Sequence, residues 1–284
     1  MKRGFEMTKF FKLLLCCMLV LGLAVVAGCS STNKASNEKV FRVGMECGYA
    51  PFNWTQTNAD NGAVQIKGTQ EYANGYDVMI AKQIAEAMGA KLEIHKIEWD
   101  GLTPAVNAGK IDAVIAGMSI TEKRKESVAF SAPYYNASIV VLTKKDSKFA
   151  NAKGINDLAG AVVTSQLNTI WYDLIPQIPS VQAKPAIDNV PSMIVALDSG
   201  KVEALILDRP TALAAVHSNP GLVAVEFKDG NGFKVSNEDV EMGVAVAKNN
   251  TTLLDQINAK LTAISEADRD KLMEEAIKNQ PLSK

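Results

Sequence analysis

The chain has 284 residues, of which 47% are hydrophobic, 21% charged and 6% aromatic, a composition typical of one large or two small globular domains. A formal net charge of −1 argues against a nucleic-acid-binding protein, which needs a basic surface for phosphates. Only two histidines and four cysteines are present, so a metal centre built from these residues is hard to supply. We therefore expect no metal and no cofactor.

The N-terminus has the pattern of an export signal. Basic residues up to Lys12 precede an uncharged apolar run over residues 13–28, which is short for a membrane span. The run ends in Val26-Ala27-Gly28-Cys29, which resembles a bacterial lipobox, although Leu is commoner than Val at its first position. We expect a lipoprotein signal peptide (1–28), lipidation of Cys29 and a polar tether (29–37). The alternative is plain secretion with a chance cysteine.

Strand-like and helix-like segments alternate along the rest of the chain. Predicted strands are Val40–Met45, Leu92–Ile97, Ile111–Ala116, Ile139–Thr143, Ala161–Thr164, Ala204–Leu207 and Val244–Ala247. Predicted helices are Asp77–Met88, Leu102–Ala108, Ser192–Asp198, Thr211–Val216, Leu253–Ile264 and Glu266–Asn279, with Ser265 and Asp268 as a cap before the last. Trp54 to Gly75 is predicted to be a polar loop with a hairpin turn at Asn61-Gly62. This rhythm indicates an α/β fold with largely parallel sheets.

One stretch has the features of an anion site. The predicted strand Ile111–Ala116 leads through the turn Gly117-Met118-Ser119 to a helix start at Thr121, with Arg124 three residues further on. A helix N-terminus offers free N–H groups to an anion, and arginine adds a planar fork that suits a carboxylate. Ser119 can bond to either end of a zwitterion. The alternative is that Thr121 merely caps a helix while Arg124 faces solvent.

Several motifs follow one another in a characteristic order. They are Phe41-Arg42-Val43-Gly44, Tyr49-Ala50-Pro51-Phe52, Gly75-Tyr76-Asp77, Trp99-Asp100-Gly101-Leu102, Gly109-Lys110-Ile111-Asp112, Ala116–Arg124 and Phe130–Tyr135. In this order the chain resembles the periplasmic amino-acid-binding proteins of ABC importers, specifically their glutamine- and lysine/arginine/ornithine-binding group, from Phe41 to about Lys248. The resemblance implies a type II periplasmic-binding-protein-like fold, with two α/β lobes, two crossing hinge strands and the ligand in the cleft between the lobes. Lobe 1 is expected at 38–136 plus 242–284, and lobe 2 at 137–241.

The resemblance also implies site residues. Arg124 matches the clamp for the ligand α-carboxylate, completed by the turn Gly117-Met118-Ser119, with Thr121 as a further candidate. Asp208 matches the carboxylate that pairs with the α-ammonium group, and it is also placed to cap a helix. Tyr49 and Trp99 match the aromatic walls around the ligand side chain. Tyr134 and Tyr135 are expected to be structural.

Lobe 2 departs from the family at one point. The turn that normally contains Gly-Thr reads Thr164-Ser165-Gln166-Leu167-Asn168-Thr169 here. The second set of carboxylate contacts is therefore expected from the Gln166 side chain and from the backbone N–H groups of Leu167 and Asn168.

Glu46 bears on which amino acid is bound. With Tyr49 and Trp99 it would form an acidic, aromatic slot that suits a guanidinium group. We therefore expect arginine first, then lysine, ornithine or histidine, with glutamine still possible. The alternative is that Glu46 faces solvent and says nothing about the ligand.

The function implied is the substrate-binding component of an amino-acid importer. Lobe closure captures the ligand, and the closed form then docks on a permease driven by an ATPase, from a monomer anchored in the bacterial cell envelope. No spacing of residues singles out a catalytic site, so we expect no enzyme. The rival is an enzyme on the same fold, such as a cyclohexadienyl dehydratase. Because Asp208 stands where an ammonium partner belongs, an amino acid is favoured over an oxo acid.

Overall fold

A computed structural model describes residues 38–228 and 230–281. The expected signal peptide (1–28), the tether (29–37) and the lipidation of Cys29 lie outside the described residues. Within the described part, none of the helices combines the length and the apolar character that a membrane span requires.

The first of two main sheets defines lobe 1. Its strands are β1 (Val40–Met45), β6 (Lys91–Lys96), β7 (Ala113–Val114), β8 (Val128–Phe130) and β16 (Ala245–Ala247), in the order β6-β1-β7-β16-β8. The strands β6, β1 and β7 are parallel, whereas β16 runs antiparallel to both of its neighbours. Helices α2 (Tyr76–Ala87) and α3 (Trp99–Asn107) pack on these strands, and α9 (Thr251–Thr262) and α10 (Glu266–Asn279) pack on α2.

The second sheet defines lobe 2. Its strands are β10 (Ile139–Lys144), β11 (Val162–Thr164), β12 (Gln182–Ala183), β13 (Ala204–Asp208) and β14 (Leu222–Val225), in the order β12-β11-β13-β10-β14. Its helices are α5 (Ile170–Asp173), α6 (Val190–Asp198) and α7 (Arg209–Ser218), with the short turns η2 (Ile155–Leu158) and η3 (Ile175–Gln177). Every residue of β13 is buried, as expected for a central strand that is covered on both faces.

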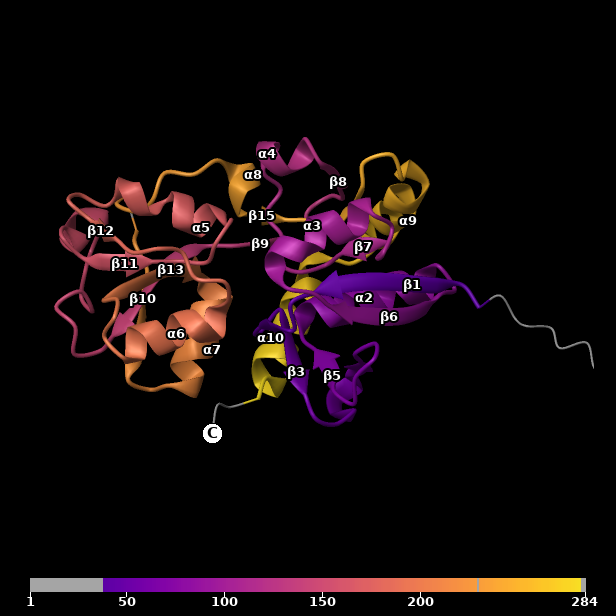
Figure 1. Cartoon of the computed structure of the whole chain (residues 1–284), viewed down its shortest axis with the longest axis horizontal. Coiled ribbons are helices and arrows are strands. Elements are labelled where there is room, and N and C mark those ends of the chain that lie inside the picture. The colour runs from indigo at the N-terminus through magenta and orange to yellow at the C-terminus, as the bar shows by residue number, and fades with distance from the viewer. Residues whose placement is uncertain (1–37, 229, 282–284) are drawn as a thin grey trace, which may run out of the picture. The chain divides into compact units, whose positions relative to one another are not determined.

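Two short strands connect the lobes. The chain leaves lobe 1 through β9 (Tyr135–Asn136) and returns through β15 (Glu241–Met242), directly after the short helix α8 (Asn237–Val240). The strands β9 and β15 pair with each other in antiparallel fashion, and they lie between the two sheets (Figure 1). The predicted two-lobed α/β fold with two crossing strands is confirmed.

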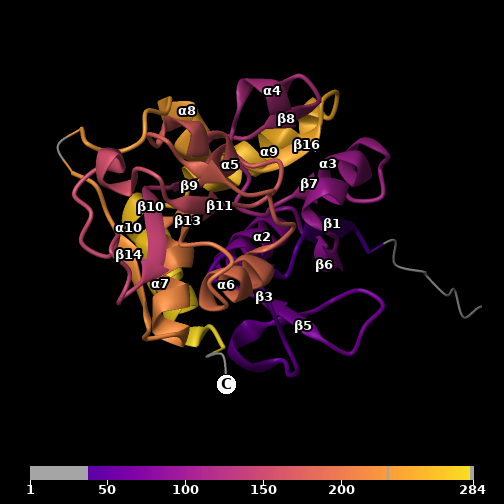
Figure 2. The ribbon, with the colours of Figure 1, turned by 60° about the vertical axis from the view of Figure 1, so that its left-hand side comes forward.

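The region predicted to be a polar loop is a sheet instead. Four short strands, β2 (Gly48–Tyr49), β3 (Asn53–Gln56), β4 (Val64–Gln65) and β5 (Tyr72–Asn74), form it in the order β2-β3-β5-β4, near β6 (Figure 2). The predicted hairpin turn at Asn61-Gly62 is also wrong, since these residues belong to the 3₁₀ turn η1 (Asp60–Gly62). The strands on either side of that turn, β3 and β4, pair with β5 and not with each other.

Two further predictions need correction. The sheets are mixed, because one strand of each, β16 in the first and β10 in the second, runs antiparallel to both of its neighbours. The predicted strand Ile111–Ala116 is a strand only over β7, although Ile111, Ile115 and Ala116 are also buried. A run of apolar residues indicates that a segment is buried. It does not determine the direction of the strand or how many of its residues pair with a neighbouring strand.

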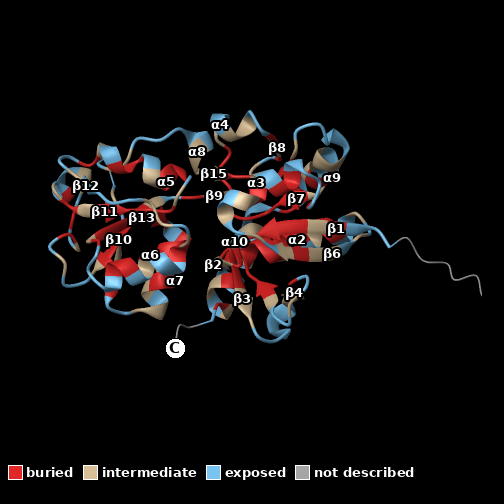
Figure 3. Cartoon of the chain, viewed as in Figure 1, coloured by how far each residue is buried: buried red, intermediate tan, exposed pale blue. Residues whose placement is uncertain are grey.

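The helix predictions fare better. Both C-terminal helices are present as α9 and α10, and the Ser265 Oγ accepts a hydrogen bond from the Asp268 N–H at 3.2 Å, as its predicted cap. Buried residues concentrate in the sheets and on the inner helix faces, whereas the outer faces are exposed (Figure 3). The amphipathic spacing seen in the sequence therefore reflects packing on the sheets.

Candidate functional site

The turn after β7 holds Arg124 on lobe 1. Thr121 precedes α4 (Glu122–Lys125), and its Oγ1 accepts a hydrogen bond of 3.2 Å from the Arg124 N–H, which confirms the predicted cap. The guanidinium group turns back over the preceding turn, where Nη1 donates to the Ser119 carbonyl at 2.8 Å. The alternative in which Arg124 simply faces solvent is therefore wrong.

The same guanidinium group reaches lobe 2. Its Nη2 donates to the Asn168 carbonyl at 3.0 Å, and the Trp99 Nε1 donates to that oxygen at 3.3 Å. The guanidinium carbon lies 5.0 Å from the centroid of the Trp99 ring, a cation–π geometry. Burial lowers the pKa of Arg124 to about 10, against the opposing effect of more distant carboxylates. Among the described residues, no carboxylate forms an ion pair with it, so this half-buried cation lacks a counter-ion.

A buried anion lies on the other lobe. Asp208 ends β13 and is fully buried. Its Oδ1 accepts from the Thr211 N–H at 2.9 Å, so it caps α7 as predicted, and its Oδ2 accepts from the Tyr49 hydroxyl. Burial raises the pKa of Asp208, and the hydrogen bond from Tyr49 opposes that rise. No basic side chain in residues 38–228 and 230–281 forms an ion pair with this carboxylate.

Glu46 faces the cleft and is only 8% exposed. Its Oε1 accepts a hydrogen bond of 2.9 Å from the Gln166 Nε2, which also donates to the Asp188 carbonyl at 3.0 Å. Burial raises the pKa of Glu46 to about 7, and the Gln166 bond works against this. The solvent-facing alternative for Glu46 is therefore wrong.

Gly117 allows a close approach between two parts of the site. Its φ of +59° lies in the left-handed region, and a Cβ there would lie 2.5 Å from Tyr49 Cε1. The Tyr49 ring in turn stacks on Phe52, with centroids 4.9 Å apart. Glycine is therefore needed at this position both for its backbone conformation and for space.

These groups enclose a narrow cavity between the lobes. Its volume is about 10 Å³, and its lining is Glu46, Tyr49, Trp99, Ala116, Gly117, Ser119, Arg124, Gln166, Thr169 and Trp171. A water molecule needs roughly 10–15 Å³ by this measure. An amino acid therefore enters only if the lobes separate or the lining side chains move.

The structure brings most of the predicted residues together. Seven of them line the cavity: Glu46, Tyr49, Trp99, Gly117, Ser119, Arg124 and Gln166. Asp208 lies directly behind the Tyr49 hydroxyl, and Asn168 joins the lobes through its carbonyl and through a 2.8 Å bond from its Nδ2 to Asp100. Met118 is buried behind the turn, where its carbonyl accepts from the Gly243 N–H, and it does not line the cavity.

Leu167 is placed differently from its expected role. Its N–H donates to the Ile187 carbonyl at 2.9 Å and is therefore not free to bind a carboxylate. The cavity is instead lined by Thr169 and Trp171, at the start of α5. Sequence reasoning missed these two and Ala116, although a tryptophan two residues after a predicted helix-opening turn was an available signal.

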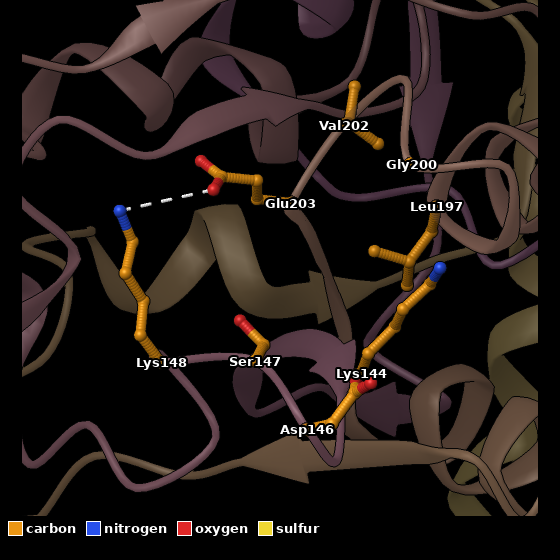
Figure 4. A pocket seen from close by; sticks show the side chains of 8 residues that line it. All are labelled: Lys144, Asp146, Ser147, Lys148, Leu197, Gly200, Val202 and Glu203. Atoms are coloured by element: carbon orange, nitrogen blue, oxygen red, sulfur yellow. Dashed lines mark ion pairs between the residues drawn. The ribbon is translucent and has the colours of Figure 1, made fainter.

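A second hollow lies on lobe 2, away from the site. It has a volume of about 350 Å³ and lies between Lys144–Lys148 and Leu197–Glu203 (Figure 4). An ion pair joins Lys148 and Glu203 at 3.9 Å (Figure 4), with the Lys148 side chain exposed and the Glu203 side chain partly exposed. Such pairs contribute little stability and select no ligand. Within the described ranges, no group of three His, Cys, Asp or Glu side chains could hold a metal ion.

Comparison with known proteins gives a consistent result. The profile of the family described as "Bacterial extracellular solute-binding proteins, family 3" matches residues 41–278. A probable histidine-binding protein of Campylobacter jejuni is 30% identical over 234 residues, covering 80% of this chain and 85% of the relative. The L-cystine-binding protein TcyJ of Escherichia coli is 29% identical, covering 89% and 90%.

Solved structures agree with the sequence relatives. An amino-acid ABC transporter substrate-binding protein from Streptococcus pneumoniae, bound to L-arginine, superposes with a TM-score of 0.73. It is 27% identical, and the match covers 84% of this chain and 93% of that protein.

Proposed function

Because this chain belongs to family 3 of the bacterial extracellular solute-binding proteins, we propose that it captures an L-amino acid between its lobes for an ABC importer. Arginine is the first candidate, followed by lysine, ornithine and histidine. Glutamine comes next.

The observation that carries this proposal is a pair of uncompensated charges. The half-buried Arg124 guanidinium on lobe 1 lines the cavity, the fully buried Asp208 carboxylate on lobe 2 lies behind the Tyr49 hydroxyl, and neither forms an ion pair within the described residues. Isolated buried charges are costly unless a partner neutralises them. The α-carboxylate and α-ammonium groups of one amino acid supply both partners, which favours a zwitterion over an oxo acid.

The preference for a basic side chain is supported by Glu46. Its carboxyl group lines the same cavity as the Tyr49 and Trp99 rings. A guanidinium group can stack on an aromatic face and donate two hydrogen bonds to one carboxylate. The relatives named for histidine and cystine, and the neighbour bound to L-arginine, mark the range of ligands to be compared.

Capture by closure follows from the inter-lobe hydrogen bonds. Gln166 bonds to Glu46, and the Asn168 carbonyl accepts from both Trp99 and Arg124. A ligand that contacts both lobes is bound fully only in the closed form, so it shifts the population toward that form.

The transport context is part of the same proposal. A monomer anchored by a lipid on Cys29 at the outer face of the cytoplasmic membrane would present the closed form to a permease and its ATPase. We expect Cys29→Ala to release the protein from the membrane fraction. Retention of this variant in the membrane would remove Cys29 as the anchor.

A competition experiment tests the ligand class. Radiolabelled arginine is dialysed against the purified protein, with lysine, ornithine, histidine, glutamine and cystine as competitors. We expect the basic amino acids to displace the label at lower concentrations than glutamine or cystine. Stronger displacement by cystine or glutamine would contradict the preference for a basic side chain.

A further inference from the structure

A buried acid that does not itself line the cavity lies at the centre of a hydrogen-bond network behind it. Asp77, the second residue of α2, is completely buried. Its Oδ1 accepts from the Tyr134 hydroxyl at 2.7 Å, and its Oδ2 accepts from the Asn53 Nδ2 at 2.8 Å. Within the described residues Asp77 has no basic partner, so these two bonds, together with the nearby Gly117 N–H, offset the cost of burying its charge. Burial nevertheless raises its pKa to about 6.

Each partner of Asp77 also accepts a hydrogen bond from a backbone N–H of lobe 1. The Tyr134 hydroxyl accepts from the Gly117 N–H at 2.9 Å, and the Asn53 Oδ1 accepts from the Cys47 N–H at 2.7 Å. Gly117 opens the turn that carries Ser119. Cys47 immediately follows Glu46. The network therefore ends on the two loops that line the cleft.

The loop at Cys47 in particular needs such support, because its backbone conformation is unfavourable for a non-glycine residue, whereas the same conformation suits a glycine at position 117. Cys47 and Gly117 have φ values of +56° and +59°, in the left-handed region. A non-glycine residue there is uncommon and costs free energy that the surrounding structure must offset. At Cys47 the hydrogen bond from its N–H to the Asn53 Oδ1 supports this conformation.

We propose that Asp77 is a positioning residue for ligand binding, because it holds Tyr134 against Gly117 and Asn53 against Cys47 and so fixes both cleft-lining loops of lobe 1. The inference rests on the proposed function, in which these loops contact the ligand. It gives Tyr134, expected from the sequence to be only structural, a role in positioning the site.

The direction of the hydrogen bonds explains why an acid is needed. Both partners donate to Asp77, so the central group must accept on both oxygens, as an ionised carboxylate does. An asparagine at position 77 has one acceptor and one donor end. Its NH₂ group would face either the Tyr134 hydroxyl, whose O–H would then lose its acceptor, or the Asn53 NH₂ group, where two donors would meet, so one of the two bonds donated to residue 77 is lost in either orientation.

The same logic supplies a rescue variant. In Asn53→Asp/Asp77→Asn, residue 53 would accept from the Cys47 N–H and from the new amide at 77. The amide oxygen at 77 would still accept from the Tyr134 hydroxyl. All four hydrogen bonds of the network are then restored, and the negative charge lies on residue 53 instead of residue 77.

The first experiment follows amide hydrogen exchange of the whole chain by NMR at pH 8, without ligand. We expect Asp77→Asn to speed exchange at Cys47 or Gly117 roughly tenfold or more, the effect of losing about one buried hydrogen bond. Tyr134→Phe should affect Gly117 alone, and the double variant should restore both amides. Tyr135→Phe is the matched control, because the Tyr135 hydroxyl makes no hydrogen bond within the described ranges.

The second experiment measures arginine affinity of the same variants by calorimetry, with urea unfolding to show that each is folded. We expect roughly tenfold weaker binding for Asp77→Asn and for Tyr134→Phe, and recovery in the double variant. Tyr135→Phe should stay within twofold of wild type. If the double variant does not fold, the difference in arginine affinity between Tyr134→Phe and Tyr135→Phe tests the positioning role.

The outcomes separate this inference from the proposed function. Unchanged exchange at Cys47 and Gly117 in Asp77→Asn, or identical affinities of Tyr134→Phe and Tyr135→Phe, would overturn the positioning role. Faster exchange in a protein whose wild type binds no arginine would keep that role and reject arginine as the ligand. The affinity comparison then moves to the amino acid that the wild type binds most tightly.

Discussion

The Arg124 guanidinium and the Asp208 carboxylate lie on opposite lobes around one cleft, and each is desolvated without an ion-pair partner in the described part of the chain. Arg124 is held by carbonyl oxygens of Ser119 and Asn168, and Asp208 by the Tyr49 hydroxyl and the Thr211 N–H. These neutral partners give both charged groups hydrogen bonds, but they do not neutralise either charge. A bridging zwitterion balances both at once.

Replacing Arg124 by lysine should abolish tight binding of every amino acid. Lysine keeps the positive charge but loses the planar fork that bonds a carboxylate through two N–H groups. We expect affinity to fall by at least about a hundredfold, since charge-assisted bonds contribute roughly 1.5–3 kcal/mol each. Calorimetry measures the change.

Arg209→Lys is the matched control for that variant. Arg209 forms a half-exposed ion pair with Glu226 outside the cleft, so its replacement should leave affinity within about twofold. Equal losses in the two lysine variants would remove Arg124 from the ligand site.

Asp208→Asn separates the two roles of Asp208. Asparagine caps helices about as well as aspartate, so the Thr211 N–H keeps its acceptor and the free energy of unfolding should change by less than about 1 kcal/mol. The negative charge opposite the ligand ammonium is lost, so affinity should fall at least tenfold. Urea unfolding and calorimetry on the same sample give both numbers. A large loss of stability with unchanged affinity would show that Asp208 caps the helix but does not contribute to ligand binding.

Gly117→Ala should damage the site as well as the fold. The left-handed backbone costs a Cβ roughly 1–2 kcal/mol, and contact with the Tyr49 ring adds to this. Gly68→Ala is matched in backbone, with φ of +78°, but has no atom within 4 Å of its Cβ. We expect the Gly117 variant to be less stable than the Gly68 variant and to bind more weakly. Similar behaviour of the two would show that Tyr49 yields to the new methyl group.

Much of the fold could be predicted because burial leaves periodic traces. The strand at Ala204–Leu207, the cap at Thr121 and the helices after Asn250 each follow from local chemistry, namely a run of apolar residues, a side chain that accepts from the first helical turn, and 3.6-residue spacing. The small sheet at residues 48–74 could not be predicted in this way. Its strands are only two to four residues long, too short for a hydrophobic alternation to be recognised, although Tyr49, Trp54 and Ala73 in them are buried.

The limits at the site have the same origin. Arg124, Trp99 and Asp208 could be chosen from motifs, because each motif is local. The engagement of the Leu167 N–H by Ile187 depends on two segments twenty residues apart, and the contact of Arg124 with Asn168 depends on how two lobes meet. Neither hydrogen bond can be predicted from the sequence of one of its two segments alone.

Glu46 makes the pH dependence of stability testable. Burial raises its pKa from 4.5 to about 7, so the unfolded chain releases this proton more readily than the folded chain does. Stability should therefore fall as pH rises from about 4.5 to 7. Glu46→Gln should remove this part of the profile, with a gain on the order of 1 kcal/mol at pH 8 and little at pH 4. Urea unfolding at the two pH values measures it.

The control for Glu46→Gln is Glu274→Gln on the exposed face of α10. An equal gain at both pH values, or the same gain in the control, would contradict the burial argument. The same Glu46 variant should also reduce the preference for arginine over glutamine. An unchanged preference would rule out contact between Glu46 and the ligand side chain.

The central claim is that the cleft recognises both charges of an amino acid. The most direct measurement is calorimetric titration of the purified protein, unfolded and refolded to remove carried-over ligand, with arginine, agmatine and prephenate. Agmatine keeps the guanidinium and ammonium groups of arginine but lacks the carboxylate that Arg124 would clamp. The account predicts tight binding of arginine and at least a hundredfold weaker binding of agmatine, with no binding or turnover of prephenate. Equal binding of arginine and agmatine, or turnover of prephenate, would contradict it.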